Sequence, residues 1–352
     1  MPQHHYGQRL GMLDDQQFQA ALDRFRLGTL LHTEPITSGN FGQNVFVTTS
    51  QGEFVLRGSP HFDWQFPTEQ FFAYLLHEKS QLPIPWPYLL DERKDIFGWS
   101  YVLMPRLPGY QTADPQFYDT LPELDRRHIA QAMGTALAEL HSISWPICGR
   151  YDPLTQTIQP LQLQQELAWP FPTATSLQQP PQLPFSQLIV KVVRHHLEKQ
   201  ASVNAITNQE VNWGTQIIEQ AVQAADDDFQ PALVHADYSK HNLVVERLHG
   251  QWRVSGIFDL MGFFFGNSEM DLARPVATLL EEDKSRAELF LQAYHQAHQI
   301  RPSFASRFAM YMLMDRLVIW AFAKSSQKRW WDENLTFQQW AEPFISFASQ
   351  YV

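Results

Sequence analysis

The sequence predicts an α+β protein in two lobes: a small, antiparallel β-rich lobe over residues 1–104 and a larger, mostly helical lobe over residues 105–352. Two observations predict this division. The chain has 352 residues, which exceeds the size at which one hydrophobic core stops growing. Short β-forming runs dominate the first part and stretches with helical spacing of apolar residues dominate the second, with a hinge near residues 104–109.

The elements of the first lobe follow from local patterns. Residues 14–27 begin with two aspartates and carry apolar residues at helical spacing, so they predict a helix. Residues 44–49 and 53–57 are rich in β-formers and flank a tight turn, which predicts a hairpin. Residues 68–79 predict a helix that crosses the sheet, and residues 88–104 predict a second hairpin.

The second lobe is predominantly helical by the same reasoning. Apolar residues at helical spacing predict helices over residues 126–142, 186–200 and 210–225. Residues 146–190 are rich in proline and glutamine, and we expect them to be irregular. The β-forming runs within residues 243–259 predict a hairpin, and helical patterns fill the remainder.

Composition excludes several classes of function. The formal charge of −11 argues against a nucleic-acid partner, because phosphates require a basic surface. The most apolar stretches are too short to cross a membrane or are interrupted by charges, and the first residues have no apolar core typical of a signal peptide. The single cysteine, Cys148, cannot form an internal disulfide. We therefore expect a cytoplasmic protein with no membrane and no nucleic-acid partner.

The stretch VHADYSKHNLVV, residues 234–245, concentrates polar side chains just before a predicted strand. Asn242 opens this strand, and the other strand of the hairpin ends at Asp259. The two side chains should therefore lie at one end of the hairpin, although 17 positions separate them in the sequence. Together with the carboxylate of Asp237, they form a set of hard oxygen ligands that suits Mg²⁺ bound to phosphate and water.

A second feature fits the same chemistry. The segment SGNFGQN, residues 38–44, contains two glycines and precedes the first hairpin. Backbone N–H groups in such a loop can surround phosphates. A phosphate-binding loop in one lobe and oxygen ligands near a carboxylate base are the parts of a phosphoryl-transfer site.

These segments resemble those of a known family. LVHADYSKHNLVV and VSGIFDLMGFFFGNSEMDLARP are similar to the catalytic region of the aminoglycoside phosphotransferase family, which has a protein-kinase-like fold. ALAELHSI and SGNFGQNVFVTTSQGEFVLR are similar to the long helix and the nucleotide-loop hairpin of that family, in the expected order. The resemblance covers roughly residues 30–285. It implies a small-molecule kinase that uses ATP, or GTP, with Mg²⁺.

The resemblance assigns roles in the catalytic region. Asp237 is expected to be the base that orients and deprotonates the acceptor hydroxyl, and Asn242 and Asp259 are expected to hold Mg²⁺. We expect His235 to brace the catalytic loop. Asp271 is expected either to cap the helix that follows it or to steady the loop from behind.

The resemblance also assigns nucleotide contacts. The expected residues are Ser38, Gly39 and Asn40 on the phosphates, Arg57 paired with Glu69, and the linker from Met104 to Leu107 beside the adenine. Three sites depart from the family pattern. Ala236 stands where glycine is usual, Asn267 and Ser268 stand where many relatives have Asp-Pro, and Arg57 stands where the nucleotide-binding lysine is usual. Arginine keeps its charge but is bulkier and geometrically stricter than lysine.

The acceptor is less defined. Only 11 residues separate Asp259 from Asp271, which is too few for the activation segment that holds a peptide, so we expect a small-molecule hydroxyl acceptor and no protein substrate. Acidic groups could bind a cationic acceptor such as an aminoglycoside or aminosugar; they are Asp226–Asp228, Glu269 and Glu281–Asp283. Two alternatives remain open: a metabolic kinase for choline, homoserine or a related alcohol, and a catalytically weak nucleotide-binding protein.

Overall fold

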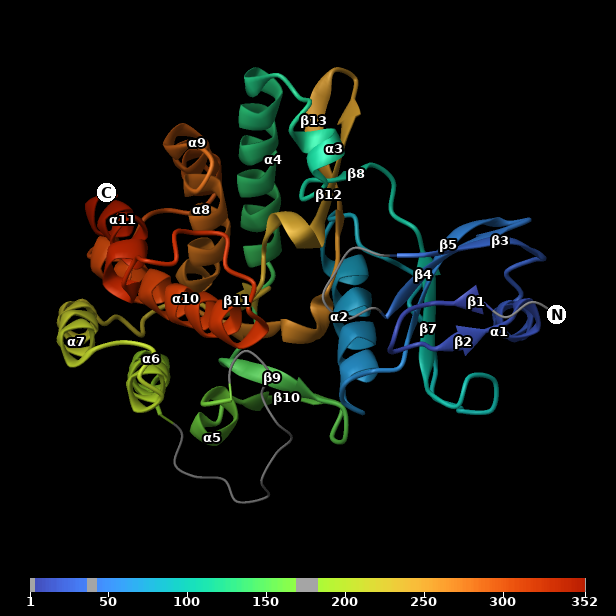
Figure 1. Cartoon of the computed structure of the whole chain (residues 1–352), viewed down its shortest axis with the longest axis horizontal. Helices are drawn as coiled ribbons and strands as arrows, with labels where there is room; N and C mark the ends of the chain where they lie inside the picture. Colours follow the sequence, from blue (N-terminus) through green and yellow to red (C-terminus); the bar gives the residue numbers. More distant parts are fainter. Residues whose placement is uncertain (1–3, 37–42, 169–182, 352) are drawn as a thin grey trace. The chain divides into compact units, whose positions relative to one another are not determined.

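The structure is a computed structural model that describes residues 4–36, 43–168 and 183–351 (Figure 1). It confirms the predicted α+β class, with antiparallel sheets followed mainly by helices. The chain forms two compact units. The first comprises Met1–Thr120, Tyr151–Thr157 and His241–Met261, and the second comprises Leu121–Arg150, Ile158–Lys240 and Gly262–Val352. The first unit therefore includes the hairpin that carries Asn242 and Asp259.

The first unit contains a five-stranded antiparallel sheet with strand order β3-β4-β5-β7-β6. Its strands are β3 (Leu30–Pro35), β4 (Asn44–Thr49), β5 (Gly52–Gly58), β6 (Leu89–Asp91) and β7 (Tyr101–Pro105). Both hairpins predicted for this region are confirmed. Alternate residues of β4 are buried, as expected for a strand with one face on a core.

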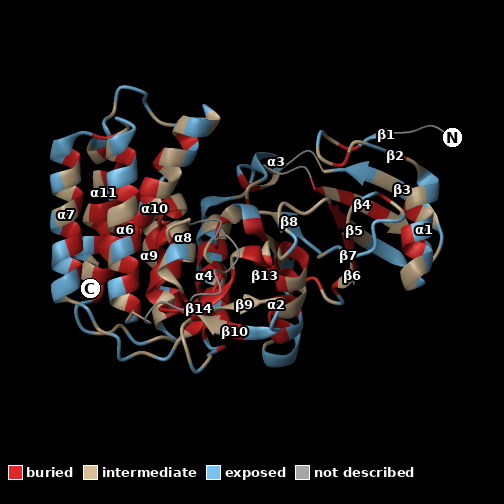
Figure 2. Cartoon of the chain, turned by 90° about the horizontal axis from the view of Figure 1, so that it is seen from below, coloured by how far each residue is buried: buried red, intermediate tan, exposed pale blue. Residues whose placement is uncertain are grey.

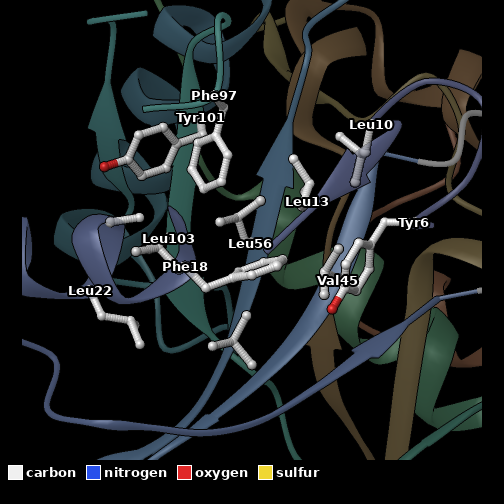
Figure 3. Packing of buried hydrophobic residues seen from close by; sticks show 12 residues of the cluster. Tyr6, Leu10, Leu13, Phe18, Leu22, Val45, Leu56, Phe97, Tyr101 and Leu103 are labelled. Atoms are coloured by element: carbon white, nitrogen blue, oxygen red, sulfur yellow. The ribbon is translucent and has the colours of Figure 1, made fainter. Parts of the chain in front are cut away.

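Helix α1 (Asp15–Phe25) packs against this sheet. It begins with a capping box, in which Asp14 accepts a hydrogen bond from the backbone of Gln17 and the Gln17 side chain accepts one from Asp14. Phe18 and Leu22 of the helix join sheet residues in one apolar cluster (Figure 3). The short pair β1 (His4–His5) and β2 (Met12–Leu13) precedes the helix.

Two further elements of the first unit carry candidate site residues. Helix α2 (Gln65–Lys79) begins three residues before the predicted start. Strands β12 (Leu243–Leu248) and β13 (Gln251–Ile257) form the predicted late hairpin, and β8 (Tyr110–Gln111) pairs with β12.

The second unit is mainly helical, as predicted. Its principal helices are α4 (Glu123–His141), α6 (Phe185–Ser202), α7 (Asn208–Gln223), α8 (Ala273–Leu280), α9 (Lys284–His295), α10 (Phe304–Ser326) and α11 (Phe337–Gln350). Helix α10 is buried over much of its length (Figure 2). Among the described residues, no helix combines the length and the apolar character needed to cross a bilayer.

The prediction of an irregular segment over residues 146–190 was wrong in part. This stretch contains β9 (Gly149–Asp152), β10 (Thr157–Pro160) and the short helix α5 (Leu163–Glu166). The strands join a sheet of order β10-β9-β14-β11, with β11 (Ala232–Val234) and β14 (Phe264–Gly266). Strand β9 pairs with the neighbouring β10 and also with β14, more than 100 positions later.

Candidate functional site

The late hairpin brings Asn242 and Asp259 to one end, as predicted. Leu243 of β12 lies opposite Ile257 of β13, and the backbone N–H of Phe258 donates to the carbonyl of Asn242 at 3.1 Å. Asn242 closes the 3₁₀ turn η1 (Lys240–Asn242) and is buried. Asp259 follows immediately after this last pairing.

Arg57 of β5 contacts two carboxylates at once. Its Nη2 lies 3.0 Å from Oδ1 of Asp259 and 3.1 Å from Oε1 of Glu69. The predicted Arg57–Glu69 pair is therefore present. Burial disfavours a charge on Arg57, but Glu69 and Asp259 raise the pKa of its guanidinium above the ordinary value.

Glu69 is fixed by two partners that sequence reasoning missed. Tyr88 donates its hydroxyl to Oε2 of Glu69, and Gln65 donates through Nε2 to Oε1 at 3.0 Å. Burial raises the pKa of Glu69, while Arg57 and these two hydrogen bonds act against that rise. Gln65 precedes Glu69 by one helical turn, so helical spacing could have indicated it. No pattern in the sequence links Tyr88 to Glu69.

Two features of this group leave binding capacity for a ligand. The Nε of Arg57 is buried and has no hydrogen-bond partner among the described residues. The second carboxylate oxygen of Asp259 accepts no hydrogen bond from a described residue, and the side chain is 25% exposed. Polar groups left without partners in this way favour an additional ligand with both anionic and cationic parts.

The remaining nucleotide candidates are less constrained. Ser38, Gly39 and Asn40 lie outside the described residues. Met104 lies in β7 opposite Val55, and Leu107 packs so closely on Gly256 that an added Cβ there would lie 2.6 Å from its Cδ1. The roles of the loop and of the linker stay predictions.

In the second unit, Asp237 is exposed in the otherwise mostly buried loop that follows β11. Its side chain is 52% exposed, and its backbone N–H donates to Nδ1 of His235 at 3.3 Å. This contact with its own loop is the bracing role predicted for His235. The next residue anchors the loop, because Tyr238 is buried and donates its hydroxyl to the carbonyl of Met133 in α4 at 2.9 Å.

Asp271 holds the same loop from behind. Its carboxylate accepts the backbone N–H groups of His235 at 2.7 Å and Ala236 at 2.8 Å, and it contacts Nε2 of His141 at 3.2 Å. The alternative role as a helix cap is wrong, because Asp271 lies inside the 3₁₀ turn η3 (Ser268–Leu272), whose N-cap is Asn267. Sequence reasoning missed His141, whose pKa is lowered by burial although Asp271 opposes this.

The alanine that replaces the usual glycine is conformationally strained. Ala236 has φ +74°, in the left-handed region that glycine adopts without steric cost. The hydrogen bond from its N–H to Asp271 helps to hold this conformation. The change from the usual glycine therefore places a side chain at a backbone conformation that disfavours one.

Residues 32–305 match the sequence model of the phosphotransferase enzyme family, APH. The match covers most of the chain and includes both groups of residues described above. The chain belongs to this family. It is therefore an enzyme, a kinase of the APH family that transfers a phosphoryl group to a hydroxyl acceptor, as the sequence resemblance implied.

Solved structures of APH enzymes share the fold of this APH chain. The GDP complex of wild-type aminoglycoside 2′-phosphotransferase-IIIa matches with a TM-score of 0.60 and 12% identity, over 96% of this chain and 99% of that one. A ternary complex of a thermostable mutant of aminoglycoside phosphotransferase APH(4)-Ia with ADP and hygromycin B has a TM-score of 0.58 and 16% identity, over 94% and 97%. A search of curated proteins finds no match.

Four of the seven acidic residues suggested for a cationic acceptor form ion pairs in this APH enzyme. Ion pairs join Glu269 to Arg301 and Arg307, Asp226 to Arg301, Glu281 to Arg316, and Glu282 to Lys240 and Arg286. Glu269 is buried between its two arginines, so it does not offer an open anionic surface. Nowhere in the described residues do three or more His, Cys, Asp or Glu side chains form a metal-binding group.

Two cavities differ in their size and in their distance along the chain from these groups. A small one of about 30 Å³ borders the catalytic loop and is lined by Ala236, Asp271, Arg274, Tyr311 and Asp315, among others. It has room for little more than a water molecule. A larger one of about 800 Å³ lies between α1 and β3 and contains none of the candidate site residues. The candidate site is therefore identified by the chemistry of its side chains and not by the size of a cavity.

Proposed function

We propose that the protein transfers the γ-phosphate of ATP, or of GTP, to a hydroxyl group of a small molecule, with Asp237 as the base. The observation that carries the proposal is the contact of Arg57 with both Glu69 and Asp259, because this arrangement links the sheet of the nucleotide-binding unit to the expected metal ligand. Only four residues separate Asp237 from Asn242, so the chain directly connects the base to the other expected ligand.

The residues fit Mg²⁺ by the chemistry of their donors. Asn242 offers an amide oxygen, and Asp259 offers a carboxylate with one oxygen that no described residue occupies. Mg²⁺ prefers such hard oxygen ligands, few in number, and completes its coordination with phosphate and water. When bound, it would neutralise charge on the phosphates.

The same group fits the phosphates of a nucleotide. Arg57 is held charged, and no described residue accepts a hydrogen bond from its buried Nε. A guanidinium can bind a phosphate through two N–H groups, so Nε and a terminal nitrogen can act together. We propose that Ser38, Gly39 and Asn40 surround the phosphates and that Met104 to Leu107 contact the adenine.

A small acceptor is supported by the segment that follows Asp259. Strand β14 within it is buried and pairs with β11, and the next residues form η3. This segment is therefore part of the core of the second unit and does not form a surface for a peptide. We propose an aminoglycoside-like or aminosugar acceptor, because similar structures include complexes with hygromycin B and kanamycin. The alternative is a metabolic alcohol such as choline or homoserine.

We also propose a cytoplasmic location, where ATP and GTP are available. Cys148 fits a reducing compartment, because it is the single cysteine of the chain and burial raises the pKa of its thiol to about 12, which makes it unreactive.

The decisive experiment is a phosphorylation screen of the purified protein. Aminoglycosides, macrolides, amino alcohols and sugars are each incubated with Mg²⁺ and either ATP or GTP, and products are detected by mass spectrometry. A gain of one phosphate on one acceptor class, absent without Mg²⁺, supports the proposal and selects the substrate class. Nucleotide binding with neither transfer nor hydrolysis would instead support the non-catalytic alternative.

A further inference from the structure

Arg274 lies near the proposed base, in the first turn of α8. Its Nη1 is 3.7 Å from Oδ1 of Asp237, and its Nε donates to Oδ1 of Asp315 in α10 at 2.5 Å. One guanidinium therefore joins the exposed carboxylate of the catalytic loop to a buried carboxylate of the longest helix. Nothing in the sequence pattern links these three residues.

The buried end of this arrangement is fixed. Both oxygens of Asp315 are used, because Oδ1 accepts from Arg274 and Oδ2 accepts from Nε and Nη2 of Arg316. Its side chain is only 8% exposed. Burial disfavours its charge, but Arg274 and Arg316 lower the pKa of Asp315 below its ordinary value. Arg274 is thus held by an ionised partner that cannot move without disturbing α10.

The other end is adjustable. A distance of 3.7 Å is within the range of an ion pair but too long for a good hydrogen bond. The small hollow beside Ala236 and Asp271 leaves room for a modest shift of the guanidinium. The same layout, a base oriented by a third group, is a general feature of sites that activate hydroxyl groups.

We propose that Arg274, anchored by Asp315, is a positioning residue that holds the carboxylate of Asp237 in its ionised form and in the orientation that accepts the hydroxyl proton. This inference rests on the proposed function. A cation within about 4–6 Å favours the charged form of a carboxylate. A misplacement of about 1 Å at such a base can lower the rate by about 10²-fold.

Other charged and titratable groups also act on this pair. Nδ1 of His235 accepts the backbone N–H of Asp237, and Glu281 just after α8 acts on Arg274 together with Asp315. Asp271 lies behind the loop, where its oxygens are already used by backbone N–H groups and His141. Arg274 is therefore the cation that contacts Asp237 among the ion pairs found in the described residues.

The test compares Arg274→Gln and Arg274→Lys with a matched control in the first unit. Arg24 has nearly the same exposure as Arg274, 18% against 19%, and it also pairs with a buried aspartate, Asp91, that has a second arginine partner, Arg93. Arg24 also pairs with the exposed Asp95, so Arg24→Gln removes two ion pairs, as Arg274→Gln does, far from the catalytic loop in sequence. Thermal unfolding of each variant shows whether it folds.

Activity is measured with Mg²⁺ and ATP, using kanamycin, hygromycin B, choline and homoserine as acceptors, and ATP hydrolysis if none is phosphorylated. We expect Arg274→Gln to lower kcat about tenfold to 10²-fold with an unchanged ATP Kd. Loss of the cation should also move the acidic limb of the kcat–pH profile to higher pH by about one unit, because the carboxylate then loses its proton at a higher pH. Arg274→Lys should recover part of kcat and should return the acidic limb of the profile most of the way to its wild-type pH. Asp315→Asn should lower kcat by less than Arg274→Gln does.

The outcomes separate this inference from the proposed function. If Arg274→Gln lowers kcat no more than Arg24→Gln does, or if the acidic limb of its kcat–pH profile does not move, the positioning role is wrong although the kinase assignment stands. A parallel rise of the ATP Kd would likewise contradict it, because Arg274 would then bind nucleotide or support the fold. If the wild-type protein shows neither transfer nor hydrolysis, the proposed function itself fails.

Discussion

Arg57 and Asp259 are joined by a contact of 3.0 Å between Nη2 and Oδ1, although 202 positions separate them in the sequence. The same nitrogen contacts Glu69, so one guanidinium nitrogen bridges two carboxylates. In the proposed site, Asp259 is also a ligand of Mg²⁺. The arginine and the metal would therefore share one carboxylate, and its second oxygen is the one available to the metal.

Arg57→Ala should raise the ATP KM about tenfold or more, because a charge-assisted contact to phosphate contributes about 1.5–3 kcal/mol. Arg57→Lys should retain part of the activity, since an ammonium keeps the charge but loses the two-pronged contact. Steady-state kinetics over ATP concentration measure both. If alanine leaves the ATP KM unchanged, another cation binds the phosphates.

Asp259→Ala should abolish turnover while the protein remains folded, because it removes the carboxylate expected to hold the metal. Titration with Mg²⁺ at fixed ATP should show that the more conservative Asp259→Asn requires more metal for half-maximal rate. A variant with wild-type turnover at the same Mg²⁺ concentration would exclude Asp259 as a metal ligand. Circular dichroism provides the control for folding.

Asp237→Asn should lower kcat by about 10²-fold or more and leave the nucleotide Kd nearly unchanged, as expected for loss of a general base. The amide has nearly the same shape as the carboxylate and can still lie beside Arg274, so a folding defect is not expected. Isothermal titration with ATP and Mg²⁺ gives the Kd, and initial rates give kcat. A Kd that weakens in step with kcat would make Asp237 a metal or structural residue.

The parts of the site that could be predicted were those encoded by short-range patterns. Two runs of β-forming residues predicted the hairpin of β12 and β13, and its register places Asn242 beside Asp259. The Arg57–Glu69 pair followed from the family resemblance and not from the residues themselves.

The parts that could not be predicted depend on packing between distant elements. Tyr88 reaches Glu69 across 19 positions, and Arg274 reaches Asp315 across 41. Neither sequence separation matches the period of a helix or a strand, so no local pattern in the sequence indicates these contacts. Asp271 steadies the catalytic loop as predicted, but its predicted role as a helix cap was wrong, because Asp271 lies inside η3, whose N-cap is Asn267.

Asp271→Ala should lower the free energy of unfolding by about 3 kcal/mol or more. The substitution leaves the buried N–H groups of His235 and Ala236 without an acceptor, and each unsatisfied group costs about 1–3 kcal/mol. Asp271→Asn keeps one oxygen and should cost less. Urea unfolding measures both, and equal losses would mean that the contact with the backbone contributes little.

His196 of α6 provides a test of stability against pH that is independent of catalysis. Its side chain is buried, and its Nε2 has no hydrogen-bond partner in the part of the chain that the structure describes. Burial, with His195 and Lys199, lowers its pKa from 6.5 to about 4. The unfolded chain therefore binds a proton below pH 6.5, whereas the folded chain resists it down to about pH 4. The stability that His196 contributes is complete above pH 6.5 and is lost as the pH falls through this window, by about 3 kcal/mol.

His196→Leu should remove this pH dependence because leucine has no proton to bind. Urea unfolding of the wild type and the variant is measured at pH 7.5 and pH 4.5, and the control is His128→Gln, which alters an exposed histidine of α4. Other acidic groups affect all three proteins, so the informative quantity is the difference in unfolding free energy between variant and wild type. We expect that difference to shift in favour of His196→Leu by about 2–3 kcal/mol between pH 7.5 and pH 4.5. A shift no larger than that of His128→Gln would show that His196 takes up a proton in the folded protein as readily as in the unfolded chain.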